Sequence, residues 1–258
     1  MSTSRERAAA AGRAAGEGVA FLRAAWATFA IYALGYPLTA VGVLLGCLAA
    51  LVGWRAFVRV GTVAWGYLVF LLMGRIIHVR GTVPAATGTP WLVVANHSSM
   101  FDIPALMAAV PGIAIMGRDY LMRIPIFGIL LRILRYVPID TRSARSARAA
   151  LEQAARTVRQ GVPLAIFAEG TRTGTGRVQQ LKRGFVHVLR ASGGSLLPVH
   201  ISGTFALKPK GKMHMSPRKR IEVTIGPPVS HAALAGLSDE QIMGKVRSIL
   251  EHLGGETA

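Results

Sequence analysis

Residues Trp91–Asp102 read WLVVANHSSMFD, and this stretch indicates both the fold and a candidate site. Its opening apolar residues predict a short buried strand that ends before Asn96 and His97. A two-serine turn follows, and Asp102 then opens the next apolar segment, which predicts a helix. A strand end, a turn and a helix start hold a side chain rigidly while leaving it accessible. We therefore predict that the imidazole of His97 is ordered and exposed.

Asp102 is the natural partner for this histidine, because a carboxylate at the start of the expected helix can point back at the ring. A carboxylate that accepts the Nδ1–H of a histidine fixes the tautomer and leaves Nε2 free as a proton acceptor. Such a pair lacks only a nucleophile, which the substrate could supply. A lone histidine beside an aspartate is more often structural, so the rest of the chain has to support the chemistry. We expect neither His97 nor Asp102 to belong to the core.

The composition is typical of a membrane-associated protein. The chain has 258 residues, of which 52% are hydrophobic, and a formal net charge of +18. Its mean hydropathy is +0.42, which is high for a soluble enzyme of this size. Apolar and basic character together indicate a basic face toward anionic headgroups or acidic substrates. A nucleic-acid binder would explain the charge but not the apolar N-terminal third. The single cysteine, Cys47, excludes an intrachain disulfide and a cysteine metal cluster, and we expect no metal site.

Residues 1–74 are expected to form a basic lead followed by membrane-associated helices. The run Ala24–Trp54 carries no charge and exceeds the roughly 20 residues that a spanning helix needs. Gly35-Tyr36-Pro37 interrupts this run, so it forms either one long kinked helix or two shorter helices in a hairpin. Arginines at both ends, Arg23 and Arg55, favour the hairpin, with both ends on the cytoplasmic side.

Residues 75–258 are expected to form a second domain of the α/β class, because short β-rich runs alternate with helical patterns. We predict a mixed, largely parallel sheet covered by helices. The expected strands are 76–80, 91–95, 113–116, 136–139, 163–167, 195–201 and 221–225. The expected helices are 103–109, 126–134, 143–160, 182–191 and 239–252.

A second constellation, FAEGTR at Phe167–Arg172, ends another apolar strand. Gly170 allows the backbone to turn tightly and expose its N–H groups. Arg172 then presents a fork of donors that fits a phosphate bidentately. The loop lacks the Gly-Lys-Ser/Thr ending of a nucleotide-binding loop. Alone it could equally be a solvated basic loop, but a His/Asp pair on a neighbouring strand favours anion binding.

These two stretches resemble the first and third motifs of the glycerolipid acyltransferase family. The third motif usually reads Phe-Pro-Glu-Gly-Thr-Arg, and Ala168 replaces the proline here, which affects loop rigidity rather than the charged groups. YVPIDTR at Tyr136–Arg142 resembles the second motif and LLPVH at Leu196–His200 the fourth, in the family's order and spacing. A lysine often lies between the first two motifs, and Arg118 stands in that place.

The resemblance implies an acyltransferase that uses no cofactor. It would move a fatty acyl chain from acyl-coenzyme A or acyl-acyl carrier protein to the free hydroxyl of a lysophospholipid, with 1-acyl-sn-glycerol-3-phosphate as acceptor and phosphatidic acid as product. His97 would be the general base, and Asp102 would orient it. The implied substrate-binding residues are Glu169, Gly170, Thr171, Arg172, Arg118 and Arg142.

Membrane lipids are the other expected partners, with the catalytic domain on the cytoplasmic face of the cell (inner) membrane and no nucleic acid involved. The basic stretch Lys208–Arg220 could lay the domain against the bilayer or be an ordinary basic hairpin. Three alternatives remain open: acylation of another lyso-lipid, such as a lyso-aminolipid or a glycolipid, a catalytically silent membrane-anchored binding module, and a hydrolase. The absence of a Gly-x-Ser-x-Gly elbow argues against the hydrolase, so we read Ser98 and Ser99 as turn residues.

Overall fold

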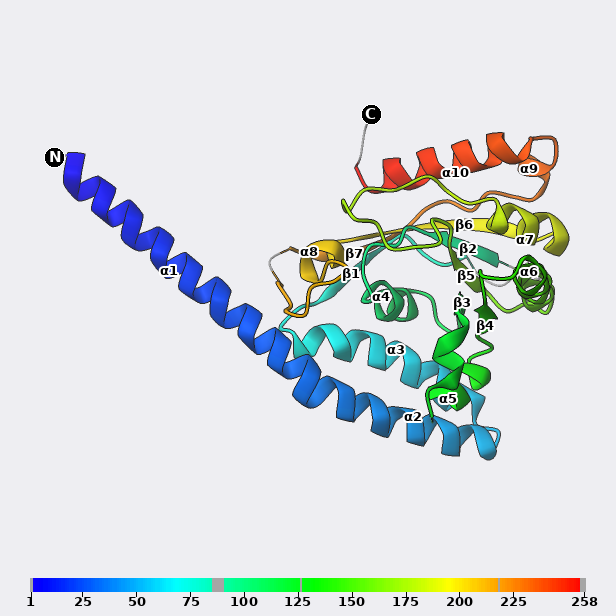
Figure 1. Cartoon of the computed structure of the whole chain (residues 1–258), viewed down its shortest axis with the longest axis horizontal. Helices are drawn as coiled ribbons and strands as arrows, with labels where there is room; N and C mark the ends of the chain where they lie inside the picture. Colours follow the sequence, from blue (N-terminus) through cyan, green and yellow to red (C-terminus); the bar gives the residue numbers. More distant parts are fainter. Residues whose placement is uncertain (1, 85–90, 126, 218, 256–258) are drawn as a thin grey trace.

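A seven-stranded sheet lies at the centre of the chain in this computed structural model, which describes residues 2–84, 91–125, 127–217 and 219–255 (Figure 1). Its strands are β1 (Ile77–Arg80), β2 (Trp91–Ala95), β3 (Ala114–Arg118), β4 (Val137–Ile139), β5 (Leu164–Phe167), β6 (Ser195–Ser202) and β7 (Ile221–Ile225). They lie in the order β1-β7-β6-β2-β5-β3-β4. The strands from β6 to β4 are mutually parallel, whereas β7 is antiparallel to β6 and parallel to β1. The carboxyl ends of β2, β3, β4 and β5 therefore meet at one edge of the sheet.

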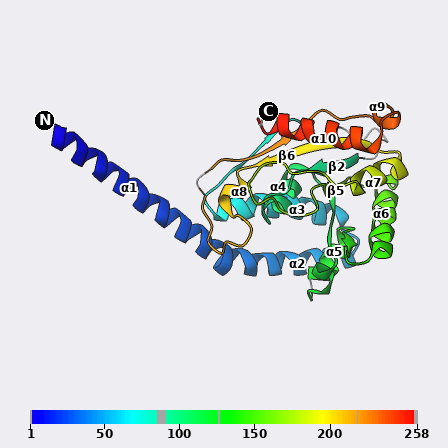
Figure 2. The ribbon, with the colours of Figure 1, turned by 45° about the horizontal axis from the view of Figure 1, so that its top comes forward.

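Helices cover both faces of the sheet (Figures 1 and 2). α3 (Arg55–Leu72) and α4 (Asp102–Ala109) lie on one face, and α6 (Ala144–Arg159), α7 (Gly184–Ser192) and α10 (Asp239–Leu253) on the other. Along β2 the buried side chains alternate, with Val93 in the first core cluster and Leu92 and Val94 in the second. The predicted α/β class with a mixed, largely parallel sheet is confirmed. Each predicted strand and long helix also forms within two residues of its expected bounds.

The pattern did not reveal the short helices between these elements. They are η2 (Asp119–Arg123), α8 (Thr204–Leu207) and α9 (Ala232–Ala235), whereas α5 (Phe127–Ile133) was predicted, one residue longer at each end. One-turn helices contain too few residues to display a period of 3.6, and tertiary contacts stabilise them rather than local propensity. Longer helices carry recognisable caps: Ser143 accepts a hydrogen bond from the N–H of Ser146 at the start of α6, and Ser238 and Gln241 form a capping box on α10.

The hairpin expected at Gly35-Tyr36-Pro37 is wrong, and the alternative of one long helix is correct. α1 (Ser2–Phe29) continues through a π-helical segment, η1 (Ala30–Gly35), into α2 (Tyr36–Leu51). Proline lacks an N–H and clashes with the carbonyl four residues earlier. The wider π turns just before Pro37 accommodate both defects without ending the helix. The chain reverses only after α2, where Gly53 adopts a φ of +74° and α3 begins at Arg55.

Two helical stretches are long and apolar enough, by length and composition, to cross a membrane: Ala15–Leu51 and Arg55–Leu72. Only 22% of the most apolar window is buried in each of them. Large apolar side chains therefore point outward along both stretches, among them Phe21, Leu22, Trp26, Leu44, Leu48, Leu51 and Val60. Figure 1 shows α1 projecting away from the sheet and α2 lying beneath α3 and α5.

The C-terminal half of α3 nevertheless packs as part of the α/β core. Phe70 and Met73 are buried in the cluster on the α4 side of the sheet. A side chain at Gly66 would place its Cβ 2.5 Å from the carbonyl oxygen of Pro104, so glycine allows α3 and α4 to approach closely. α3 is thus packed directly against the helix that begins at Asp102.

Candidate active site

His97 and Asp102 are in direct contact at the carboxyl end of β2. The Nδ1 atom of His97 lies 2.9 Å from Oδ2 of Asp102, and the side chain of His97 is 17% exposed while that of Asp102 is completely buried. Among the described residues, no hydrogen bond occupies the Nε2 atom of His97. The ring also stacks on Phe167 at the end of β5, with centroids 4.1 Å apart and an interplanar angle of 20°. The imidazole is therefore held on two sides and has one ring nitrogen available to a substrate.

Asp102 has further donors besides the histidine. Its Oδ2 accepts hydrogen bonds from the backbone N–H groups of Ser98, at 2.6 Å, and Ser99, at 2.8 Å. Its Oδ1 accepts a 2.5 Å bond from the hydroxyl of Thr204. The expectation that neither residue of the pair belongs to the core is therefore wrong for Asp102. A carboxylate stays charged in a buried site only when several hydrogen-bond donors stabilise it. The turn between β2 and α4 supplies two of these donors.

The FAEGTR loop is attached to the backbone of His97 on both sides. Oε1 of Glu169 accepts a 2.9 Å bond from the N–H of His97, and the N–H of Thr173 donates to the carbonyl of His97 at 2.8 Å. Glu169 is only 2% exposed. Gly170 adopts a φ of +70°, a conformation that favours glycine. Residues of the loop after β5 thus position His97, the second residue after β2.

Arg172 is half-buried beside a second cation, Lys208, while Thr171 is exposed. Burial lowers the pKa of the Lys208 ammonium, and the positive charge of Arg172 lowers it further. The carbonyl of Lys208 accepts a 2.8 Å bond from the hydroxyl of Ser99, which places this pair of cations next to the histidine turn. Two neighbouring cations are suited to an anionic group on a substrate.

Arg118 and Arg142 come together at the ends of β3 and β4. They line a cavity of about 280 Å³ with Asp119, Tyr120, Arg123 and Asp140. Arg118 donates to the hydroxyl of Thr141 at 2.7 Å, and Arg142 makes two 2.9 Å bonds from its guanidinium to the carboxylate of Asp140. These hydrogen bonds lower the pKa of Asp140 to about 2. No hydrogen bond within the described ranges joins this cavity to His97, although both lie at the same edge of the sheet.

Three residues that hold the site in place were not singled out from the sequence: Asn96, Phe167 and Thr204. The side-chain amide of Asn96 makes two hydrogen bonds to the backbone of Ile201 on β6, of 3.0 and 2.7 Å. Asn96 and Phe167 lie inside the two quoted stretches, so their position at strand ends was a usable signal. Thr204 lies 102 residues after Asp102, and no local pattern could have linked the two.

Comparison with known proteins gives a consistent result. Residues 76–202 match the family model described as Acyltransferase. A 1-acyl-sn-glycerol-3-phosphate acyltransferase from Cocos nucifera is 27% identical over 154 residues, covering 59% of this chain and 49% of the relative. Another from Borreliella burgdorferi is 32% identical over 135 residues, or 52% of this chain and 54% of the relative. The chain thus spans about half the length of the first curated relatives that it matches.

A solved structure resembles almost the whole chain. The crystal structure of the 1-acyl-sn-glycerophosphate acyltransferase PlsC from Thermotoga maritima is 25% identical, with a TM-score of 0.74. The match covers 90% of this chain and 95% of the other. The similarity therefore includes most of the N-terminal helices as well as the sheet.

Proposed function

We propose that this chain, which belongs to the acyltransferase family, moves a fatty acyl group from a thioester to the free hydroxyl of 1-acyl-sn-glycerol-3-phosphate, forming phosphatidic acid. The observation that supports it most directly is the His97–Asp102 pair, with a buried carboxylate on one ring nitrogen and an unoccupied position on the other. The names of the relatives from Cocos nucifera and Borreliella burgdorferi agree with this acceptor.

The proposed reaction uses His97 as general base and needs no cofactor. Nε2 removes the proton from the acceptor hydroxyl while the oxygen attacks the thioester carbonyl, and Asp102 stabilises the imidazolium that forms. The C–S bond then breaks, and the departing thiolate of coenzyme A or acyl carrier protein takes the proton back from His97. General-base catalysis contributes about 10²–10⁴-fold, and holding the two substrates together contributes much of the rest.

An acyl-enzyme is not part of this proposal, because the serines beside His97 are buried and engaged. The hydroxyl of Ser99 donates to the carbonyl of Lys208. That of Ser98 lies 3.0 Å from the hydroxyl of Thr204 and 3.4 Å from Oδ1 of Asp102. Among the described residues, neither serine hydroxyl makes a hydrogen bond to Nε2 of His97. This arrangement argues against a hydrolase that works through a serine nucleophile.

For the acceptor phosphate we propose Arg172, assisted by Lys208, with Arg118 and Arg142 in the neighbouring cavity. Arg172 offers a guanidinium fork, which matches phosphate oxygens bidentately. Arg142 is already neutralised by Asp140, so we give it the smaller part. Glu169, Gly170 and Thr171 then act by fixing the shape of the loop, since the carboxylate of Glu169 binds the backbone of His97.

An acceptor panel with one radiolabelled acyl thioester tests this function. We expect the purified protein to acylate 1-acyl-sn-glycerol-3-phosphate far faster than the corresponding lysophosphatidylcholine, lyso-aminolipid or monoacylglycerol, because only a phosphate monoester matches the paired cations. Release of free fatty acid without any acceptor would indicate a hydrolase. Equal rates with a neutral glycolipid acceptor would contradict the proposed acceptor.

In the same assay, Arg172→Ala should raise the KM for 1-acyl-sn-glycerol-3-phosphate about 10- to 100-fold, the value of one charged hydrogen bond. The matched control is Arg177→Ala, which removes an exposed arginine from the same loop and should leave both KM values nearly unchanged. If the donor KM alone rises in Arg172→Ala, the phosphate lies elsewhere.

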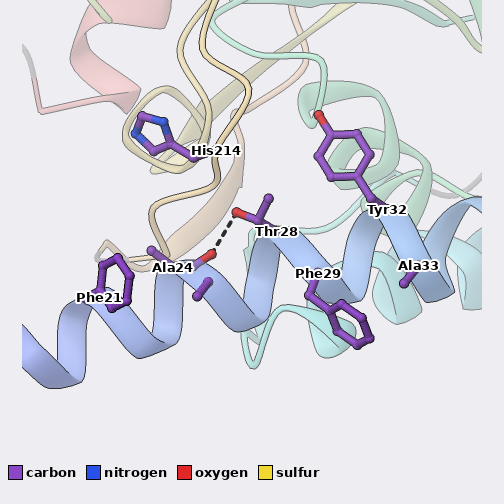
Figure 3. A pocket seen from close by; sticks show the side chains of 8 residues that line it. Phe21, Ala24, Thr28, Phe29, Tyr32, Ala33 and His214 are labelled. Atoms are coloured by element: carbon purple, nitrogen blue, oxygen red, sulfur yellow. Dashed lines mark hydrogen bonds between the residues drawn. The ribbon is translucent and has the colours of Figure 1, made fainter.

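We also propose that the protein works at the cytoplasmic face of the cell membrane, with lipids in contact with the α1–α2 helix. The segment Lys208–Arg220, termed the basic loop, adjoins this helix: the N–H of Met215 donates to the hydroxyl of Thr28 at 3.0 Å, and the hydroxyl of Tyr32 donates to the carbonyl of Met213 at 3.3 Å. Between them lies an apolar cavity of about 660 Å³ (Figure 3), lined by Phe21, Ala24, Ala25, Thr28, Phe29, Tyr32, Ala33 and His214. Apolar side chains beside a basic loop suit the boundary between acyl chains and anionic headgroups.

Fractionation tests the membrane proposal. We expect the full-length protein to stay in the membrane pellet after a wash with about 1 M salt, which screens charges beyond about 3 Å, and to require detergent for release. Deletion of residues 1–51 should weaken this retention, since it removes the longer of the two apolar helical stretches. A full-length protein that is active and soluble without detergent would contradict the proposal.

A further inference from the structure

We propose that Thr204 is a positioning residue of the His97–Asp102 pair, a role that rests on the proposed function. Thr204 is fully buried, and its hydroxyl donates to Oδ1 of Asp102 at 2.5 Å. The three other close contacts of the carboxylate, with His97 and the N–H groups of Ser98 and Ser99, all converge on Oδ2. Thr204 is therefore the principal partner of the second oxygen and fixes the rotation of the carboxylate.

Thr204 reaches Asp102 from the end of β6, the strand that pairs with β2. Thr204 begins α8 directly after β6. Gly203 precedes it with a φ of +83°, and a Cβ there would lie 1.9 Å from the carbonyl oxygen of Arg220. Only glycine tolerates both the backbone conformation and this close approach. The amide of Asn96 also ties the end of β6 to the end of β2 through Ile201. Both ends of the Thr204–Asp102 bond are thus held by rigid elements.

Loss of the Thr204 hydroxyl would free the carboxylate to rotate about its Cβ–Cγ bond. The remaining candidate partner for Oδ1 is the hydroxyl of Ser98, which lies at 3.4 Å and is itself 3.0 Å from Thr204. A longer bond from one mobile hydroxyl orients a carboxylate poorly. Rotation would misdirect Oδ2 and hence the Nδ1–H bond that fixes the imidazole. Thr204 therefore acts on turnover through Asp102 and His97, without touching the substrate.

The test compares Thr204→Val, which keeps the shape and removes the donor, with Thr204→Ser, which keeps the donor. Thr157→Val is the matched control, because Thr157 is another buried threonine whose hydroxyl bonds to a backbone carbonyl within α6. We expect Thr204→Val to lower kcat about 10- to 100-fold, the worth of a hydrogen bond to a charged group, with both KM values changed less than about twofold. Thr204→Ser should recover most of kcat, and Thr157→Val should leave it unchanged.

A readout independent of turnover separates this proposal from the proposed function. In protein labelled with ¹⁵N-histidine, the imidazole signals of wild type should report His97 as the Nδ1–H tautomer, and Thr204→Val should shift it toward a mixture. If wild type is inactive but Thr204→Val still shifts the tautomer, the proposed function is contradicted and the positioning role of Thr204 is supported. If Thr204→Val does not fold, Thr204→Cys, a weak donor, replaces it.

Double substitution gives the decisive outcome. In a His97→Ala background, Thr204→Val should cost little more, since residues that act as a unit are non-additive. Losses that multiply, or a normal kcat and an unchanged tautomer in Thr204→Val, would overturn the assignment.

Discussion

Replacing His97 with alanine is expected to lower kcat for acyl transfer by about 10²–10⁴-fold, the range that general-base catalysis contributes. The substitution removes Nε2 of His97, the nitrogen of this ring that makes no hydrogen bond to the described residues. Neither substrate-binding cluster includes the imidazole, so both KM values should change little. Initial rates with saturating thioester and 1-acyl-sn-glycerol-3-phosphate measure the effect.

The fold should survive this change, because the side chain of His97 is partly exposed and its removal leaves Asp102 with the donors from Ser98, Ser99 and Thr204. The lost stacking on Phe167 contributes about 0.5–1.5 kcal/mol at most. The control is His187→Ala, which removes an exposed histidine from α7 and should leave turnover unchanged. Normal turnover in His97→Ala would rule out the mechanism, and loss of the folded state would show that the ring is structural.

The sequence predicted those parts of the fold in which local pattern and tertiary environment agree. The strands β2, β5 and β6 are buried on both faces, and β2 and β5 read as continuous apolar runs while β6 contains the shorter run Leu196–Val199. Since parallel strands share one carboxyl edge, the motifs that follow β2 and β5 had to lie close together. The contact between His97 and Asp102 follows from their separation within a turn and a helix start. These features depend on neighbours in the chain or on one simple rule of sheet geometry.

Other features depend on partners that are distant in sequence. Pro37 predicts a helix break, but the π-helical segment before it lets the helix continue. The residues Gly35-Tyr36-Pro37 do not by themselves predict this continuation. The complete burial of Asp102 arises because α8, which follows β6, closes over it. Similarly, Arg142 reads as a free cation until the fold shows its guanidinium bonded to Asp140. Burial and charge pairing are properties of the assembled fold, so the sequence alone could not provide them.

Substitution of Asp102 should have two separable effects, one on turnover and one on stability. Asp102→Asn retains the shape of the side chain. Its carbonyl oxygen can take the place of Oδ2, where His97 and the N–H groups of Ser98 and Ser99 donate. Its NH₂ group can then donate to the hydroxyl of Thr204, which can turn to accept. We therefore expect a folded protein whose kcat is about 10- to 100-fold lower, because a neutral amide stabilises the imidazolium less than a carboxylate does.

Asp102→Ala should instead damage the fold as well as the reaction. It leaves the two backbone N–H groups of the turn without their acceptor in a fully buried site, and the Thr204 hydroxyl keeps only the hydroxyl of Ser98 as a partner. Each buried donor without a partner costs about 1–3 kcal/mol, so thermal unfolding should occur well below the wild-type temperature even if water reaches some of these groups. Thermal unfolding in detergent, with initial rates on the same samples, distinguishes the two variants. If Asp102→Ala were as stable as wild type, the carboxylate would not organise the turn. The lower kcat of Asp102→Asn could then not be assigned to the lost charge alone.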